Sequence, residues 1–234
     1  MWSDQVVADI VAAFEPLADG QRAASMRAYM KDVTPFLGLS AAVRRAAQAK
    51  VWRALPEPTQ AQLCAAAAGL RELAAREYHY AAAEMWGRWE SLLAAERLDA
   101  DVRVALLHVP WWDTVDLLGT QVITPMVRRH PHLVSVMWDW NSSADQWLVR
   151  ASIQHQRGLR QDTDIDRLLA MCTPHVADRR FFVAKAIGWA LRDTCALDPV
   201  AVRQFVQTHP ELPAVARREA DRGLARATPS STAP

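Results

Sequence analysis

Apolar side chains recur every three or four positions along most of this chain, which is the spacing of one face of an α-helix. The pattern predicts an amphipathic helix over residues 4–18 and a second helix over residues 21–31. The apolar side of the first helix is expected to carry Val7, Ile10, Val11 and Phe14. No run of alternating β-branched residues bounded by turns occurs, so the pattern predicts an all-α protein.

Turn residues divide the rest of the helical pattern. A turn is predicted over residues 34–40, where Ser40 is a candidate N-cap for the next helix. A proline pair that begins at Pro56 precedes a long alanine-rich helix. Residues 227–234 are small and polar with two prolines, which predicts a disordered tail. Because no linker interrupts the chain before it, we predict one domain over residues 1–226.

An internal repeat runs through the chain with steps of 34 or 35 residues. Each repeat begins a predicted helix with an apolar or aromatic residue: Val43, Tyr78, Trp112, Trp147 and Phe182. Ten residues later, four of the five repeats carry arginine: Arg53, Arg88, Arg157 and Arg192. A period near 35 in a helical chain indicates stacked helix pairs. We therefore predict an α-solenoid of antiparallel pairs whose concave side presents one helix per repeat.

The last repeat contains a helix with two distinct faces. Its apolar stripe consists of Val183, Ala186, Ile187, Ala190 and Leu191. The opposite side carries Lys185, Gly188, Trp189 and Arg192. An indole outside the apolar stripe, flanked by cations and a glycine, is typical of a binding surface. Packing of Trp189 against the next repeat is the alternative.

Charge and composition constrain the function only in part. The formal net charge is +1, but 24 of the 27 cations are arginines, which suit bidentate phosphate contacts. No run of 18 apolar residues indicates a membrane span, and the first residues lack the pattern of a signal peptide. The three cysteines show no metal-binding spacing and are expected to be reduced, buried thiols, so we predict a cytoplasmic protein.

The segment from Trp111 to Asp116 carries the clearest candidate chemistry. In a helix, Trp112 and Asp116 would lie one turn apart on the same face, so an indole and a carboxylate would stand side by side. Such a pair suits a cationic or electron-poor ligand. The alternative is a core tryptophan beside a solvated acid. The histidines lack metal-binding spacing, and no phosphate loop or nucleophile elbow occurs, so no metal or cofactor is predicted.

Several runs in a fixed order resemble one known family, the AlkD-type DNA alkylation-repair glycosylases, which are built from HEAT-like helical repeats. The matching runs are Tyr29-Met30-Lys31, Pro35-Phe36-Leu37-Gly38-Leu39, Trp111-Trp112-Asp113-Thr114-Val115-Asp116, His130-Pro131, Trp147-Leu148-Val149-Arg150-Ala151 and residues 181–192. The two runs that contain Trp112 and Trp189 are the most specific. The segment from Pro56 to Asp101 matches poorly, which leaves its role in DNA contact open.

The resemblance implies an enzyme that removes purines alkylated at N3 or N7 from double-stranded DNA by hydrolysis of the N-glycosidic bond. Substrates would be of the 3-methyladenine and 7-methylguanine type, and bulky adducts would be tolerated because the base is not flipped. No lysine is clearly placed for lyase chemistry, so we expect a monofunctional enzyme, and no cofactor or metal is expected. We also expect a monomer with no membrane partner that acts at the bacterial nucleoid.

Site residues also follow from the resemblance, position by position. The catalytic cluster would be Trp112, Asp116 and Trp189. The DNA-binding residues would be Arg150, Lys185, Arg192, Tyr29 and Lys31. The alternative function is a helical-repeat module that binds DNA or protein without catalysis. A DNA-binding module has no need of a carboxylate among phosphates, so the presence of Asp116 favours the enzyme. The preferred adduct is left open.

Overall fold

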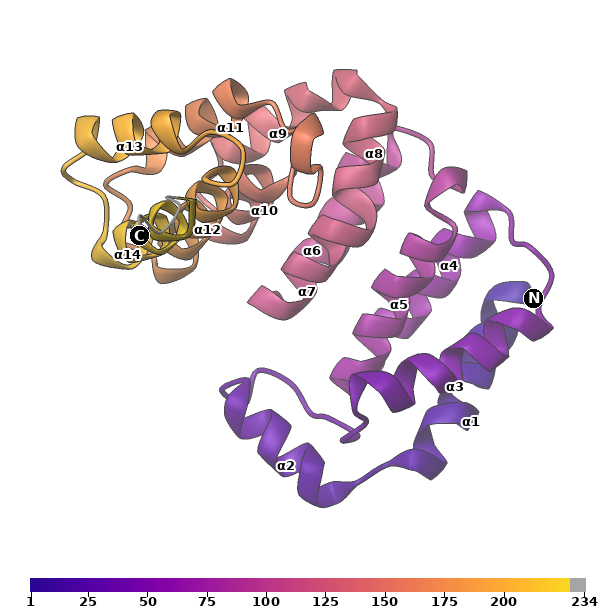
Figure 1. The fold of residues 1–234 in the computed structure, drawn as a ribbon. Coiled ribbons are helices and arrows are strands. Elements are labelled where there is room, and N and C mark those ends of the chain that lie inside the picture. The colour runs from indigo at the N-terminus through magenta and orange to yellow at the C-terminus, as the bar shows by residue number, and fades with distance from the viewer. Residues whose placement is uncertain (228–234) are drawn as a thin grey trace, which may run out of the picture. The chain divides into compact units, whose positions relative to one another are not determined.

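The computed structural model describes residues 1–227, and each regular element among them is a helix or a helical turn. The predicted all-α class is therefore confirmed. The chain divides into two compact units, one ending at His130 and the other starting at Pro131. In Figure 1 the first unit runs from indigo to magenta, and the second continues to yellow. The prediction of one domain over residues 1–226 remains a prediction.

The first unit contains eight α-helices and four short helical turns within the described residues. The α-helices are α1 (Trp2–Phe14), α2 (Gly20–Tyr29), α3 (Ala41–Ala54), α4 (Gln60–Arg71), α5 (Arg76–Arg88), α6 (Arg103–Leu107), α7 (Trp112–Leu118) and α8 (Thr124–Arg129). The turns are η1 (Glu15–Leu17), η2 (Glu90–Leu92), η3 (Leu98–Val102) and η4 (Gly119–Ile123). Because η4 joins α7 to α8 without a break, a helical run extends from Trp112 to Arg129.

Helix α1 packs against α3 and α4, and its buried face differs from the predicted one. Val6, Ile10 and Phe14 are fully buried, whereas Val7 and Val11 are only half-buried. The buried stripe starts at Ser3 and continues at intervals of three and four residues. It includes the predicted Ile10 and Phe14, but it excludes Val7 and Val11. Part of the expected stripe was thus wrong, because adjacent valines do not indicate which of them faces the core.

The helix boundaries of the first unit follow local capping chemistry. The Ser40 hydroxyl accepts a hydrogen bond from the Val43 amide at 3.3 Å, which confirms it as the N-cap of α3. The alanine-rich segment after the proline pair is two helices and not one long helix. Helix α4 starts with a capping box formed by Thr59 and Gln62, and it ends at Arg71 before α5 begins at Arg76.

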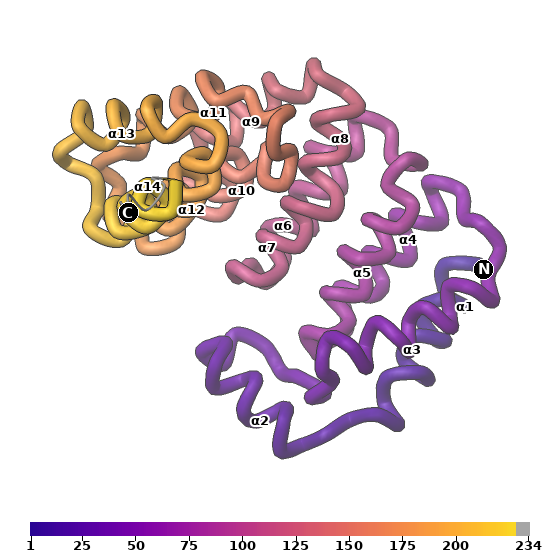
Figure 2. The backbone as a smooth tube through the Cα atoms, viewed as in Figure 1, coloured from indigo at the N-terminus to yellow at the C-terminus, as the bar shows by residue number. Residues whose placement is uncertain are grey.

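The second unit contains six α-helices and three short turns within the described residues. The α-helices are α9 (Val134–Asn141), α10 (Gln146–Gln154), α11 (Ile165–Cys172), α12 (Phe181–Thr194), α13 (Pro199–Thr208) and α14 (Ala214–Ala227). The turns are η5 (Pro131–Leu133), η6 (Arg160–Asp162) and η7 (Thr173–His175). Helix α12 packs against α10 and α14, and the orange and yellow tubes of α12 and α14 lie side by side in Figure 2.

The predicted repeat register corresponds to real helices. The five repeat positions all lie in the first three residues of a helix, namely α3, α5, α7, α10 and α12. The five residues predicted as the apolar stripe of α12 are all buried, which confirms that part of the pattern. Gly188 was expected on the open face, but it is buried beneath α14. Its hydrogen atom takes the place of a Cβ that would lie only 3.0 Å from the Ala216 Cα.

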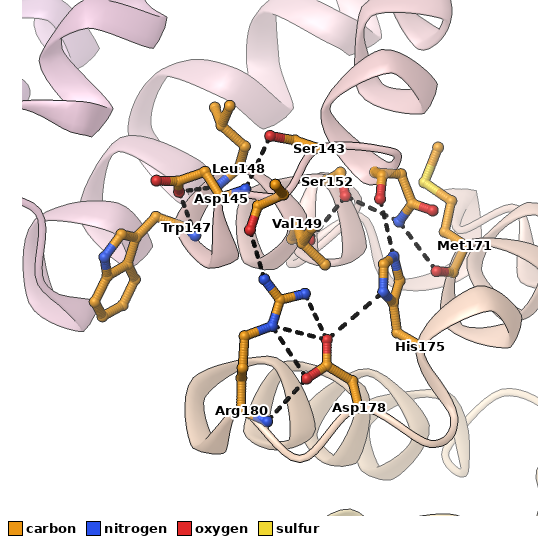
Figure 3. Close-up of polar contacts among 12 residues, drawn as sticks. Ser143, Asp145, Trp147, Leu148, Val149, Ser152, Met171, His175, Asp178 and Arg180 are labelled. Carbon is orange, nitrogen blue, oxygen red and sulfur yellow. Dashed lines mark hydrogen bonds and ion pairs between the residues drawn. The ribbon is translucent and has the colours of Figure 1, made fainter.

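A polar network joins the segment before α12 to α9 and α10 (Figure 3). The Arg180 guanidinium bonds both oxygens of Asp178 and also donates to the Ala144 carbonyl at 2.7 Å. The His175 ring bonds the Asn141 carbonyl, and the Asn141 amide donates to the Ser152 hydroxyl within α10. These bonds connect the end of α9, the residue pair before α10, the last turn of α10 and the segment before α12. They therefore set the register of the two helices that carry the candidate cations of this unit.

No helix of the described residues is long and apolar enough to cross a membrane. Of the predicted tail, 227–234, only Ala227 falls among the described residues, where it ends α14. The remaining tail positions lie outside the described residues. The three cysteines are free thiols; Cys172 and Cys195 are buried as predicted, and Cys64 is half-buried. Burial raises the pKa of Cys172 to about 12, so this thiol stays protonated and packs as an apolar group.

Candidate functional site

The first turn of α7 is held in place by a buried ion pair. Arg76 of α5 bonds both carboxylate oxygens of Asp113, with Nη2 to Oδ1 at 2.7 Å and Nε to Oδ2 at 3.0 Å. The Tyr80 hydroxyl donates to the same carboxylate. Burial and the Asp113 charge raise the pKa of Tyr80, so the phenol keeps its proton. Asp113 is therefore a structural anchor that connects α7 to α5.

The same arginine stabilises a strained turn before α7. Val109 has a φ of 42°, a left-handed conformation that β-branched residues rarely adopt. The Arg76 Nη1 donates to the Val109 carbonyl at 2.8 Å, and its Nη2 also donates to the Thr114 hydroxyl at 3.0 Å. This guanidinium therefore fixes the backbone on both sides of the Trp-Trp pair. The local conformation that presents Trp112 depends on a residue far away in the sequence.

Trp112 and Asp116 lie one helical turn apart on α7, and both are half-buried. Trp112 is thus not a core residue, although its neighbours Thr114 and Val115 are buried. The Tyr29 ring meets the Trp112 indole edge-on, with 6.3 Å between ring centroids and 84° between planes. Tyr29 is 71% exposed. The structure therefore brings together two residues that the resemblance assigned to different parts of the site.

A shallow cavity of about 340 Å³ adjoins this aromatic pair within the first unit. Its lining comes from α2, α5, α7 and the segment after α2: Ser25, Met26, Tyr29, Met30, Phe36, Tyr80, Trp112 and Asp113. Lys31 follows Tyr29 with a φ of 59° and is exposed, so it lies at the turn that ends α2. The segment between this turn and α3 is held by Glu77, a buried carboxylate that accepts hydrogen bonds from the amides of Gly38 and its two neighbours.

Trp189 is the centre of a cationic cluster in the second unit. It is half-buried, and four cations lie within about 6 Å of its ring centroid. The distances are 4.9 Å for the Arg150 Cζ, 4.9 Å for the Arg157 Cζ, 5.3 Å for the Lys185 Nζ and 6.0 Å for the Arg192 Cζ. The negative faces of the indole make so many nearby cations tolerable. The expected grouping of Lys185, Trp189 and Arg192 on one face of α12 is present.

Lys185 and Arg192 also share a carboxylate. The Lys185 Nζ lies 2.9 Å from the Glu219 Oε1, and the Arg192 Nη1 lies 2.8 Å from its Oε2. Arg222 approaches the Oε1 atom at 3.2 Å. Only 5% of the Glu219 side chain is exposed. The hydrogen bond from Lys185 lowers the pKa of Glu219 and outweighs the opposing effect of burial, so the carboxylate is charged beneath the two cations.

Arg150 lies deeper than a simple surface cation would. Only 1% of the residue is exposed, and its Nη1 donates to the Phe182 carbonyl at 2.8 Å. Its position over Trp189 is therefore fixed from the first turn of α12. The Phe182 ring in turn packs on Trp147, with 4.8 Å between centroids. In this conformation the Arg150 side chain supports Trp189, while its contact with phosphate remains a prediction.

The site residues therefore form two groups, one in each unit. Trp112, Asp116, Tyr29 and Lys31 belong to the first unit, and Arg150, Lys185, Trp189 and Arg192 belong to the second. Their assembly into one catalytic surface remains a prediction. The sequence interpretation missed Glu219, Arg76 and Tyr80. A signal for Glu219 existed, because a further step of 35 residues from Phe182 ends at position 217, within α14.

Comparison with known proteins identifies the family. A family model described as DNA alkylation repair enzyme matches residues 10–224. The chain belongs to this family. A solved structure, a predicted DNA alkylation repair enzyme from Enterococcus faecalis, is similar with 25% sequence identity and a TM-score of 0.81. The match covers 89% of this chain and 97% of that chain. Among the curated proteins, none matches.

Membership of the DNA alkylation repair enzyme family confirms the resemblance drawn from the tryptophan-containing runs. The family match spans almost the whole described chain, so both groups of site residues lie inside it. The structural match over both units also confirms the predicted fold class, an α-solenoid of stacked helix pairs.

Proposed function

We propose that this DNA alkylation repair enzyme is a monofunctional glycosylase that hydrolyses the N-glycosidic bond of purines alkylated at N3 or N7 in duplex DNA. The observation that carries the proposal is the half-buried pair of Trp112 and Asp116 on α7. Asp113, the other acid of this segment, is occupied by Arg76 and Tyr80. Asp116 is the acid of this helix that lies one turn from Trp112, so it is the proposed catalytic carboxylate.

The chemistry explains why a carboxylate and indoles suffice. Alkylation at N3 or N7 places a positive charge on the purine, so the base leaves without a general acid. Cleavage of the bond develops oxocarbenium character on the deoxyribose. Asp116 stabilises that charge and orients the attacking water. Trp112 and Trp189 pack on the sugar and favour the developing cation through the negative faces of their rings.

Contacts with the backbone hold the lesion in the duplex, and the base is not flipped into a pocket. Lys185 and Arg192 are the proposed phosphate contacts, and each exposes about a quarter of its side chain in the present pairing with Glu219. Arg150, whose guanidinium lies over the Trp189 ring, holds the backbone near the lesion. Tyr29 and Lys31, both exposed at the end of α2, lie against the duplex. The product is an abasic site.

Incubation with methylated duplex DNA tests the proposal directly. The wild-type protein should release 7-methylguanine and 3-methyladenine, identified by chromatography. Asp116→Asn should slow release by about two orders of magnitude, near 3 kcal/mol, because one preorganised electrostatic group is removed. The matched control is Asp139→Asn, an exposed acid of α9, which should retain the wild-type rate. Full activity of Asp116→Asn would show that Asp116 is not the catalytic carboxylate. Lack of base release by the wild type would favour a DNA-binding module without catalysis.

Release of neutral bases supplies a second check on the mechanism. Hypoxanthine and uracil carry no charge, so they need protonation that a carboxylate and two indoles do not provide. Their release should be undetectable under conditions that excise 7-methylguanine completely. Comparable rates for neutral and cationic bases would reject the mechanism, even if the protein proved to be a glycosylase.

A further inference from the structure

A cavity of the second unit lies on the side of Trp189 toward the ends of α12 and α14. It has a volume of about 590 Å³ and is enclosed by the loop after α10, the second half of α12 and the last turn of α14. Small-molecule sites in proteins are commonly about 300–1,000 Å³. The cavity is therefore large enough for a ligand the size of a nucleotide, and the proposed function makes no use of it.

The lining has an apolar floor and a cationic rim. Ile153, Leu168 and Leu197 contribute to the floor. The rim carries four arginines that come from three separate segments of the chain: Arg157, Arg160, Arg192 and Arg226. One acid, Asp193, also lines the cavity, and it lies 3.3 Å from the Nε atom of Arg192. The charge of the rim is therefore strongly positive.

Two of these arginines have no acidic partner among residues 1–227. Arg160 and Arg226 are exposed, and no carboxylate of the described residues forms an ion pair with either. Arg160 also has a φ of 53°, an unusual conformation that places it at the start of a short helical turn. Guanidinium groups without acidic partners at the rim of a cavity are suited to bind phosphate oxygens.

We propose that this cavity binds one unmodified purine nucleotide unit, with the base on the apolar floor beside Trp189 and the phosphate at Arg160 and Arg226. The inference rests on the proposed function, because that function places Trp189 at the lesion and so brings a DNA strand to the cavity. A cationic alkylated base is disfavoured there by four guanidinium groups. The ligand is therefore a neutral, unpaired nucleotide near the lesion and not the lesion itself.

Calorimetric titration of the full chain with deoxyguanosine 5′-monophosphate tests the site. The nucleotide should bind saturably at one site, and deoxyguanosine or inorganic phosphate alone should bind at least about tenfold more weakly, since each makes half of the contacts. The double variant Arg160→Ala, Arg226→Ala should raise the Kd for the nucleotide by about tenfold or more. A lack of saturable binding would overturn the proposal.

A matched control separates the site from general charge. The double variant Arg203→Ala, Arg218→Ala removes the same charge from exposed positions of α13 and α14 that do not line the cavity. It should bind the nucleotide as the wild type does. All four arginines are exposed, so both double variants should keep the wild-type unfolding temperature. Equal losses of nucleotide affinity in the two double variants would show that only net charge matters, and would reject the cavity as the nucleotide site.

Duplex probes distinguish a strand nucleotide from a free one. A duplex with one unpaired guanine should lose affinity for the Arg160→Ala, Arg226→Ala variant, whereas a fully paired duplex should not, and free nucleotide should compete with the first. Equal losses for both duplexes would overturn the strand assignment. Measuring base release as well as nucleotide binding tests the glycosylase and the nucleotide site separately. A wild-type protein that excises 7-methylguanine but binds no nucleotide rejects only the cavity, and the reverse result rejects only the glycosylase.

Discussion

Two acids three residues apart on α7 have different environments, and their substitution should separate stability from activity. Asp113 is 8% exposed and pairs with Arg76, which is itself fully buried. Asp113→Asn leaves that guanidinium uncompensated and should lower the free energy of unfolding by about 3 kcal/mol. Asp116→Asn, at a half-buried position, should change it by less than about 1 kcal/mol. Urea denaturation of both variants measures the difference, and equal effects would show that Asp113 is no anchor.

Two buried histidines should make folding stability depend on pH. Burial lowers the pKa of His79 and of His155 to about 4, from an ordinary value near 6.5. Between these values the unfolded chain binds more protons than the folded one, so stability is complete above about pH 6.5 and falls as pH decreases toward 4. Each histidine contributes on the order of 3 kcal/mol over that window.

Substitution of one histidine isolates its share of this dependence. His155 bonds the Ser152 carbonyl and is 1% exposed. His155→Gln should flatten the loss of stability between pH 6.5 and 4, measured by urea denaturation at several pH values. His132→Gln, at an exposed position, serves as the control and should keep the wild-type slope. A variant of His155 with an unchanged slope would show that its protonation is not coupled to unfolding.

At the scale of elements, two glycines allow α14 to lie close to α12. A Cβ at Gly188 would lie 3.0 Å from both the Ala216 Cα and the Glu219 Cβ, and one at Gly223 would lie 2.9 Å from the Arg192 Cα. The contacted Cα and Cβ atoms are fixed by the backbone, so a change of side-chain rotamer cannot relieve the clash. The close approach also carries Glu219 to its position between Lys185 and Arg192.

Replacement of Gly188 by alanine should therefore destabilise the second unit. The added methyl group must separate α14 from α12, and overpacking of this kind costs about 1–3 kcal/mol. Gly119→Ala is the matched control, because a Cβ there meets nothing within 4 Å and alanine is the better helix former. Thermal unfolding should show a lower Tm for the first variant and an equal or higher Tm for the second. The opposite order would contradict the packing account.

The helix starts that could be predicted from the sequence are those that recur with the internal repeat. A period of 35 residues located the starts of α3, α5, α7, α10 and α12, because each repeat must bury the same helix face. The period could not locate the partners of charged groups. Arg76 pairs with Asp113, which lies 37 residues later, and Lys185 pairs with Glu219, which lies 34 residues later. Both ion pairs therefore join neighbouring repeats. Such pairs depend on which helix packs on which, and the apolar pattern alone does not fix that.

At the scale of the whole molecule, positive and negative side chains are nearly equal in number, so the protein carries no large net charge. The net charge of +1 gives little general attraction for DNA, so binding must come from local groups of arginines and lysines. The sequence indicated those groups through the resemblance, but it did not show that Glu219 compensates two of them. The family was recognisable because its tryptophan-containing runs are distinctive. The compensating acid was not, because it lies outside those runs.

Glu219 should therefore limit the affinity of this protein for undamaged DNA. Lys185 and Arg192 each donate to its carboxylate, which takes the place of a phosphate and competes with one. Glu219→Gln should tighten binding to undamaged duplex and steepen its salt dependence by about one unit of slope for each cation released. Glu211→Gln makes the same change in net charge at an exposed position and should have a much smaller effect.

Titrations of labelled duplex at several salt concentrations measure both slopes. Equal slopes for the two variants would mean that only net charge matters. Weaker binding by Glu219→Gln would mean that the carboxylate holds the two cations in place for phosphate and does not compete with it.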